Sequence, residues 1–85
     1  MEQRPYNFVG ATIRRLRNAK NWTQEVLAAR CGVAGCDITR GTLAKIEAEI
    51  RGISDVELFV IAQVLGVGIE ELFPHGFAAR LKRGI

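Results

Sequence analysis

Apolar residues recur at intervals of three and four along most of the chain. This spacing places them on one face of a helix, whereas a half-buried strand would need strict alternation, which no stretch shows. The pattern predicts five helices, over residues 8–20, 24–31, 40–48, 55–65 and 69–73. The apolar positions within them are Val9, Ile13 and Leu16; Leu27, Ala28 and Cys31; Leu43 and Ile46; and Leu58, Ile61, Ala62 and Leu65. The fold class is therefore expected to be all-α.

The predicted helix starts share one arrangement, in which an apolar residue precedes a capping residue and a second apolar residue follows the cap by four positions. The cap accepts hydrogen bonds from the first turn, and the two apolar side chains form a hydrophobic staple. The four instances are Trp22-Thr23-Leu27, Ile38-Thr39-Leu43, Ile53-Ser54-Leu58 and Val67-Gly68-Leu72. Helix ends are predicted at residue types that tolerate the left-handed conformation, namely Asn21, Gly32, Gly52 and Gly66.

Length and composition indicate one small globular domain. A chain of 85 residues buries only about 60–65% of its unfolded surface, so its stability should be modest and a dimer is a reasonable expectation. Hydrophobic residues make up 48% of the chain and charged residues 25%, which is typical of globular proteins and not of disordered ones. The longest apolar run is too short for a membrane span, and the N-terminus does not resemble a signal peptide. We therefore expect no membrane partner and a cytoplasmic location.

The net charge of +3 is unevenly distributed. Residues 1–51 carry nine Lys and Arg against five Asp and Glu, and residues 52–74 carry four acids and no base. The tail adds three bases. One half of the molecule could therefore face a polyanion such as DNA, although a solvated charged surface would show the same imbalance.

Three segments appear in a recognisable order: "IRRLRNAKNWTQEVLAARCGV", "RGTLAKIE" and "ELFVIAQVLGVGIEELF". Together, over about residues 9–74, they resemble the Xre/Cro-type, lambda-repressor-like helix-turn-helix family. The resemblance implies a five-helix DNA-binding domain over residues 8–74, preceded by an N-terminal arm, residues 1–7, and followed by a basic tail, residues 75–85. It also implies that the second helix crosses the DNA backbone and the third lies in the major groove.

Four residues are expected to contact phosphate. Gln24 begins the second helix, where its backbone N–H, its amide and the helix dipole can meet one phosphate, and the family resemblance gives it that role. Thr23, Thr42 and Arg51 are the other expected phosphate contacts. The alternative for Thr23 and Gln24 is an ordinary helix start without DNA contact.

Base contacts are expected from the third helix. Leu43 and Ile46 should face the core, which leaves Arg40, Gly41, Ala44 and Lys45 on the outward face. Arg40 and Lys45 match the base-contacting positions of the family, and we expect base contacts at Arg40, Gly41 and Lys45. Arginine can make a bidentate contact to guanine worth about 1–3 kcal/mol of discrimination. Gly41 departs from the family pattern: either the backbone approaches DNA closely there, or the position contacts no base. The alternative for the two basic residues is a plain solvated charge.

The resemblance also implies an internal ion pair between Arg17 and Glu47, which would brace the first helix against the third. The turn between the second and third helices departs from the family pattern, because Val33 to Ile38 make it about five residues longer. The staple that follows is intact, so the insertion should lengthen the turn without changing the phase of the third helix. The angle between the two helices is then left open by the sequence.

Two cysteines and a single histidine are too few for a structural zinc site, which needs four ligands. Cys31 falls on an apolar helix face and is interpreted as a small core residue, with a disulfide or redox switch to Cys36 as the alternative. No metal or cofactor is expected. We also expect no enzymatic activity, because no histidine lies near a nucleophile in the sequence and there is no glycine-rich phosphate loop.

The sequence therefore predicts a transcriptional regulator that binds double-stranded DNA sequence-specifically as a homodimer. The expected dimer surface is the acidic, apolar segment 54–74 together with Phe77 and Leu81. The alternative is an antitoxin-like or other interaction module that holds a protein partner through residues 54–85.

Overall fold

The computed structural model of the protein describes residues 5–77. Within them the chain forms four α-helices, α1 (Gly10–Ala19), α2 (Gln24–Val33), α3 (Arg40–Glu47) and α4 (Asp55–Leu65), and one short 3-10 helix, η1 (Ile69–Leu72). The described part contains no strand, so the predicted all-α class is confirmed. The fifth predicted helix differs in kind, because it is a single 3-10 turn.

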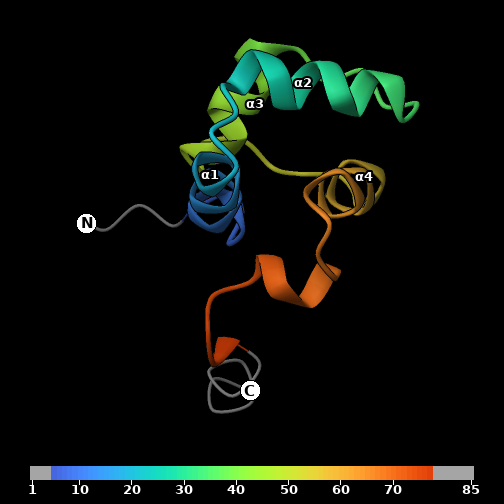
Figure 1. Ribbon diagram of the computed structural model, residues 1–85. Coiled ribbons are helices and arrows are strands. Elements are labelled where there is room, and N and C mark those ends of the chain that lie inside the picture. The colour runs from blue at the N-terminus through green and yellow to red at the C-terminus, as the bar shows by residue number, and fades with distance from the viewer. Residues whose placement is uncertain (1–4, 78–85) are drawn as a thin grey trace.

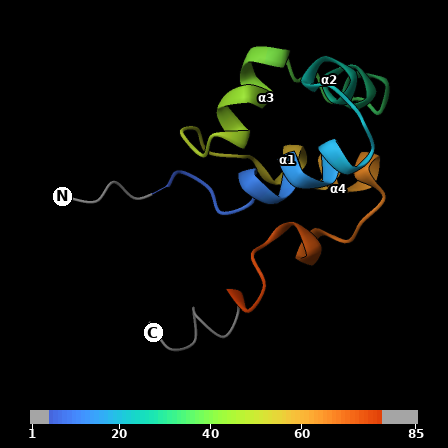
Figure 2. The same ribbon diagram turned by 60° about the vertical axis from the view of Figure 1, so that its left-hand side comes forward.

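The helices are arranged with α2 and α3 at one end of the molecule and η1 at the other (Figures 1 and 2). Between them lie α1 and α4, which contact each other, and α1 also contacts α3 while α2 contacts α4. The helix that is expected to contact DNA is thus at the opposite end from η1.

One hydrophobic core joins all five elements. Each contributes at least one fully buried apolar side chain, and the largest of these are Val9, Ile13, Leu27, Cys31, Leu43, Ile46, Ile61 and Leu72. The predicted helical faces therefore face the interior, except that Leu16 and Leu58 are only partly buried and pack against the core's edge. Burial of large aliphatic side chains contributes about 1.5–3 kcal/mol each relative to exposure, so this cluster is the main source of stability.

The predicted caps form at three helix starts. The side chains of Thr23, Thr39 and Ser54 accept hydrogen bonds from the N–H groups of Val26, Thr42 and Glu57, respectively. Glu57 also accepts from the Ser54 N–H at 2.9 Å, which completes the predicted capping box. At η1, where Gly68 has no side chain, the Glu71 carboxylate accepts from the Gly68 N–H at 2.7 Å.

The predicted helix ends are correct at two positions and wrong at two. Asn21 and Gly66 have positive φ, 58° and 77°. Gly32 lies inside α2, and Gly35 takes the left-handed conformation with φ 99°. The Cys36 N–H then donates to the Cys31 carbonyl at 2.9 Å, a hydrogen bond that the left-handed Gly35 makes possible. The left-handed residue therefore lies three residues beyond the predicted position.

The end of α3 is the second error. Gly52 does not take positive φ; Glu49 does, at 62°. A left-handed conformation costs a non-glycine residue about 1–2 kcal/mol. The Glu49 carboxylate offsets part of that cost, because it accepts a hydrogen bond from the Ala11 N–H at 3.1 Å. A side-chain contact to another helix thus overrides the local preference for glycine.

The α2–α3 turn runs over residues 34–39. Its last apolar residue, Ile38, is buried in the core, so α3 begins from a fixed point even though the turn is long. Among the described residues, no helix combines the length and the apolar character that a membrane crossing requires.

Candidate nucleic-acid interface

The outward face of α3 carries the three residues expected to contact bases. Arg40, Gly41 and Lys45 are exposed, while Leu43 and Ile46 on the opposite face are fully buried. The Thr39 cap fixes where the helix starts, and the two buried side chains fix its rotation about its own axis. Within the described residues, neither basic side chain takes part in an ion pair. Their donors are therefore available to base edges.

Glu47, the last residue of α3, binds side chains from two other helices. Its carboxylate accepts hydrogen bonds from Arg17 Nε at 2.7 Å and Arg17 Nη2 at 2.9 Å, and from Gln24 Nε2 at 3.0 Å. The structure thus brings together Arg17 of α1, Gln24 of α2 and Glu47 of α3, three of the residues singled out in the sequence.

The Arg17–Glu47 pair is buried, with 9% and 3% of the two side chains exposed. Arg17 Nη1 also donates to the Trp22 carbonyl at 2.8 Å, so the guanidinium is held on both sides. The hydrogen bonds to Glu47 raise the pKa of Arg17, and burial opposes that rise. Both charges are satisfied by hydrogen bonds in a bidentate geometry, which is the condition under which a buried ion pair is tolerated. The pair ties the last turn of α1 to the end of α3.

Three of the expected phosphate contacts, Thr23, Gln24 and Thr42, lie at the starts of α2 and α3. At α2, Thr23 satisfies one N–H of the first turn, and the N–H of Gln24 points out along the helix axis, as the geometry of any helix start requires. Gln24 is partly buried, and its amide nitrogen has one hydrogen engaged by Glu47 and a second that remains for another acceptor. At α3, the Thr42 hydroxyl accepts a hydrogen bond from the Thr39 hydroxyl at 3.0 Å.

The Arg51 side chain is not free for phosphate alone, because it binds a carboxylate of the protein. Its Nη1 and Nη2 donate to the Glu57 carboxylate at 3.0 and 3.2 Å, and Nη1 also donates to the Gly52 carbonyl. These hydrogen bonds, with those from Ser54, lower the pKa of Glu57. A guanidinium has five N–H donors, so a phosphate contact by Arg51 requires it to be shared with Glu57.

The segment before α1 holds the C-terminal end of α3, and sequence reasoning missed it. Asn7 is 5% exposed, and its Nδ2 donates to the Ile46 carbonyl at 3.0 Å and to the Arg51 carbonyl at 2.8 Å. Its Oδ1 accepts from the N–H groups of Val9 and Gly10. The signal in the sequence was an asparagine, a favoured capping type, just before a helix. Its partners, Ile46 in α3 and Arg51 after it, lie 39 and 44 positions away and leave no local trace.

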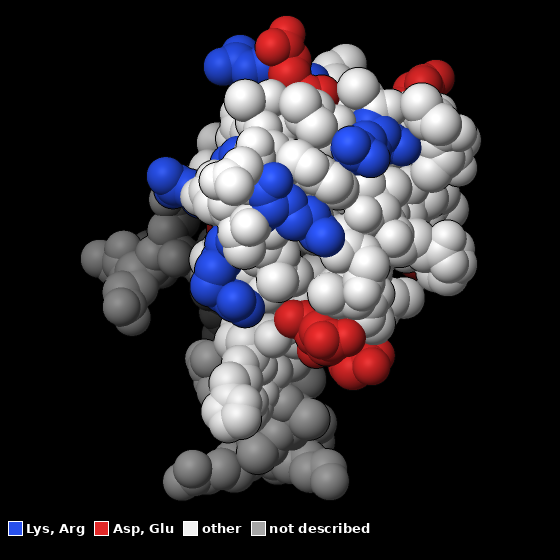
Figure 3. All heavy atoms as spheres, viewed as in Figure 1, with Lys and Arg blue, Asp and Glu red and all other residues white. Residues whose placement is uncertain are grey.

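In Figure 3 basic side chains spread over the part of the surface formed by α1, α2 and α3, while acidic side chains gather lower down, over η1, and also stand at the upper edge. Two of the bases are held against the turn between α1 and α2, where Lys20 and Arg30 lie 5.2 and 4.3 Å from the centre of the Trp22 ring. The charges that are unevenly distributed along the sequence are therefore also unevenly distributed over this surface.

Cys31 and Cys36 are both free thiols in the structure. Cys31 is fully buried, and burial raises the pKa of its thiol to about 11. Cys36 is half-buried and packs against the core. The interpretation of Cys31 as a core residue agrees with this burial, since a thiol that stays protonated behaves as a small hydrophobic group.

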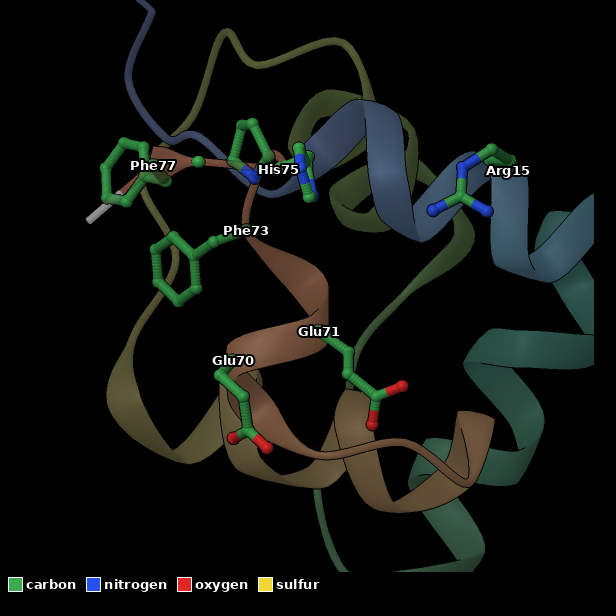
Figure 4. A pocket seen from close by; sticks show the side chains of 8 residues that line it. Arg15, Glu70, Glu71, Phe73, His75 and Phe77 are labelled. Atoms are coloured by element: carbon green, nitrogen blue, oxygen red, sulfur yellow. The ribbon is translucent and has the colours of Figure 1, made fainter. Parts of the chain in front are cut away.

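A pocket of about 580 Å³ lies between α1 and the segment after η1. Figure 4 shows Arg15 on its α1 side, Glu70 and Glu71 on η1, and the rings of Phe73 and Phe77 beside each other. The centroids of these two rings are 5.1 Å apart, and Phe77 lies at the same distance from Phe8. The residues that line the pocket belong to α1 and to residues 70–77, so the pocket is separate from the proposed DNA contacts on α3.

Parts of three sequence predictions fall outside the described residues. These are residues 1–4 of the arm, residues 78–85 of the basic tail, and Leu81 of the expected dimer surface. Within residues 5–77, no group of three or more His, Cys, Asp and Glu side chains is placed to hold a metal ion.

Comparison with known proteins gives one match. No curated protein and no solved structure matches the chain significantly. A family model described as helix-turn-helix matches residues 13–72, which include α2, the turn, α3 and α4 in full. This match covers more than half of the chain, and the four α-helices are four of the five helices that the resemblance to Xre and lambda-repressor-like proteins implied. The protein belongs to the helix-turn-helix family, a family of DNA-binding regulators.

Proposed function

We propose that the protein is a cytoplasmic transcriptional regulator that binds double-stranded DNA sequence-specifically, with α3 in the major groove. The main support for the proposal is the outward face of α3, where Arg40 and Lys45 are exposed while the opposite face is buried in the core. An exposed arginine at the start of a rigid helix can make a bidentate contact to guanine O6 and N7. Lys45, more than one turn further along, can contact a second base step.

Phosphate contacts would fix the register of the protein on the duplex. We assign them to Gln24 and Thr23 at the start of α2, to Thr42 in the first turn of α3, and to Arg51 in the loop after α3. Backbone N–H groups at a helix start and side-chain donors are the groups that contact phosphates in DNA complexes, and they supply affinity without sequence information. The Glu47 hydrogen bond supports the role of Gln24, because it restricts the amide to one orientation.

We further propose that the protein binds as a homodimer. Val56 and Phe59 lie one turn apart on α4 and are 59% and 51% exposed, and α4 carries no Lys or Arg. An apolar face of this kind on a DNA-binding domain fits a second copy, whose α3 would then enter a major groove about 34 Å away.

The test is a binding selection with the full chain against random duplex DNA at physiological salt. We expect a two-fold symmetric motif with half-sites about one helical turn apart. Arg40→Ala and Lys45→Ala should each relax base preference at one or two positions, whereas Gln24→Ala should weaken binding to all sequences about equally. Arg14→Ala is the matched control, because it removes an exposed arginine from α1 and leaves α3 unchanged.

Two outcomes would contradict the proposal. If Arg40→Ala and Lys45→Ala select the same motif as the wild type, these residues do not contact bases. If the wild type enriches no motif and binds DNA only weakly and in a salt-sensitive way, the domain does not recognise a DNA sequence. Binding of a protein partner through residues 54–85 would then be the better proposal.

A further inference from the structure

The α2–α3 turn does not by itself determine the direction of α3. In this turn six residues, 34–39, join the two helices, and a connection of that length is compatible with many angles between them. Buried contacts of Leu43 and Ile46 fix which side of α3 faces the core. The angle of the helix axis must be fixed by contacts at its ends.

The C-terminal end of α3 is held by a dense set of contacts from the segment before and at the start of α1. Asn7 is the centre of this set, because its four hydrogen bonds join the first turn of α1 to the Ile46 carbonyl and to the loop before α4. The Tyr6 N–H donates to the Glu49 carbonyl at 2.9 Å, and the Glu49 carboxylate accepts from the Ala11 N–H.

Gly10 makes this contact possible. A Cβ on Gly10 would collide with the carbonyl of Ile46 and come within 2.9 Å of the carbonyl of Glu47, so the backbones of α1 and α3 meet directly. Backbone-to-backbone contact is stiffer than contact through long side chains, which can change rotamer. The two helices are thus fixed relative to each other at this point.

A small change here would be felt most in the C-terminal half of α3, because buried Ile38 fixes the start of the helix. From Arg40 to Lys45 the helix rises about 7.5 Å, so a tilt of about 10° about its start would displace the Lys45 backbone by about 1.3 Å. Productive contacts tolerate a displacement of only about 0.5 Å. Lys45 would therefore lose its base contact, and Arg40, which is closer to the pivot, would be displaced much less.

We infer that Asn7 is a positioning residue for DNA recognition, which sets the angle of α3 from its C-terminal end and so determines where Lys45 meets the bases. Asn7 acts through α3 and does not itself contact DNA. The inference rests on the proposed function, in that α3 must be the helix that contacts bases.

The test uses Asn7→Asp in the full chain. The substituted carboxylate keeps the shape of the side chain and still accepts from Val9 and Gly10, but it loses both donors and faces the Ile46 and Arg51 carbonyls with a negative charge. We expect a loss of base discrimination of about 5- to 150-fold at the position that Lys45→Ala identifies, the range that one bidentate contact supplies. Discrimination at the position identified by Arg40→Ala should change less.

A second, milder variant and a control accompany it. Glu49→Ala removes only the carboxylate that accepts from Ala11, and it should produce a smaller loss at the same base position. Ala29→Gly weakens the exposed side of α2 without touching the contact between α1 and α3, so it controls for lost stability. All variants are compared at a temperature at which circular dichroism shows each to be folded.

The outcomes separate the inference from the proposed function. If Asn7→Asp and Glu49→Ala keep the wild-type base preferences, or lose affinity uniformly for all sequences as Ala29→Gly does, Asn7 has no positioning role although the wild-type motif still supports DNA recognition. If the wild type enriches no motif at all, the proposed function fails, and the inference fails with it.

Discussion

Gly41 offers the sharpest test of how α3 meets DNA. Its conformation is helical, not left-handed, and a Cβ placed on it would lie 3.9 Å from Thr39 Oγ1, an ordinary contact distance, with no closer atom outside the helix backbone and its neighbours. The described structure therefore gives no steric reason for a glycine. Since glycine weakens a helix, we expect the reason to lie in the complex with DNA.

The substitution Gly41→Ala should have opposite effects on stability and on binding. The added methyl group reduces the conformational freedom of the unfolded chain and should raise the free energy of unfolding by about 0.5–1 kcal/mol, or the melting temperature by about 2–8 °C. On the DNA side, the methyl group would hold the backbone of α3 away from the bases. We expect affinity for the selected site to fall about tenfold, which corresponds to about 1.4 kcal/mol.

Thermal unfolding followed by circular dichroism measures the first effect, and titration of the selected duplex at fixed salt measures the second. A variant that is more stable and binds the selected site with wild-type affinity would refute the close approach and show that Gly41 contacts no base. A variant that is less stable would refute the steric reasoning itself, because it would mean that the methyl group meets an obstacle.

Three further predictions concern the fold. Glu47→Leu should lower the free energy of unfolding in urea by about 3–5 kcal/mol, because it leaves the Arg17 charge buried without a partner, and the double variant with Arg17→Met should recover most of the loss; additive losses would contradict this. Hydrogen bonds lower the pKa of Glu57 below its ordinary 4.5, so its contribution to stability should be present above that pH and disappear as the pH falls through the lower folded-state pKa. Denaturant unfolding across this range should show a flatter pH dependence in Glu57→Gln, and an unchanged dependence would be the contrary result. With a thiol reagent at pH 8, Cys36 should react quickly and Cys31, whose pKa is about 11, only as fast as the chain unfolds; two fast thiols would exclude the buried position of Cys31.

Helix positions and the core could be predicted because they depend on local spacing. The staple around Thr39, for example, needs only residues 38–43, and both the cap and the buried Leu43 are found where the pattern places them. The all-α class followed from the same periodicity. The ends of α2 and α3 were mispredicted because several neighbouring residues can take the left-handed conformation that ends a helix. At α2 this residue is Gly35 and not Gly32, and after α3 it is Glu49, a residue type that disfavours the conformation.

The candidate interface was predictable to the extent that it lies on one helix. The sequence by itself determined that Arg40, Gly41 and Lys45 share the outward face of α3, because the phase of a helix is fixed by its own buried residues. Tertiary structure alone decided what surrounds them. Gln24 is held by Glu47, Arg51 shares its guanidinium with Glu57, and Asn7 reaches Ile46 across 39 positions of sequence. Such contacts depend on how the helices pack in three dimensions, and the long α2–α3 turn leaves that packing, and hence the direction of α3, to be set by residues far away in the chain.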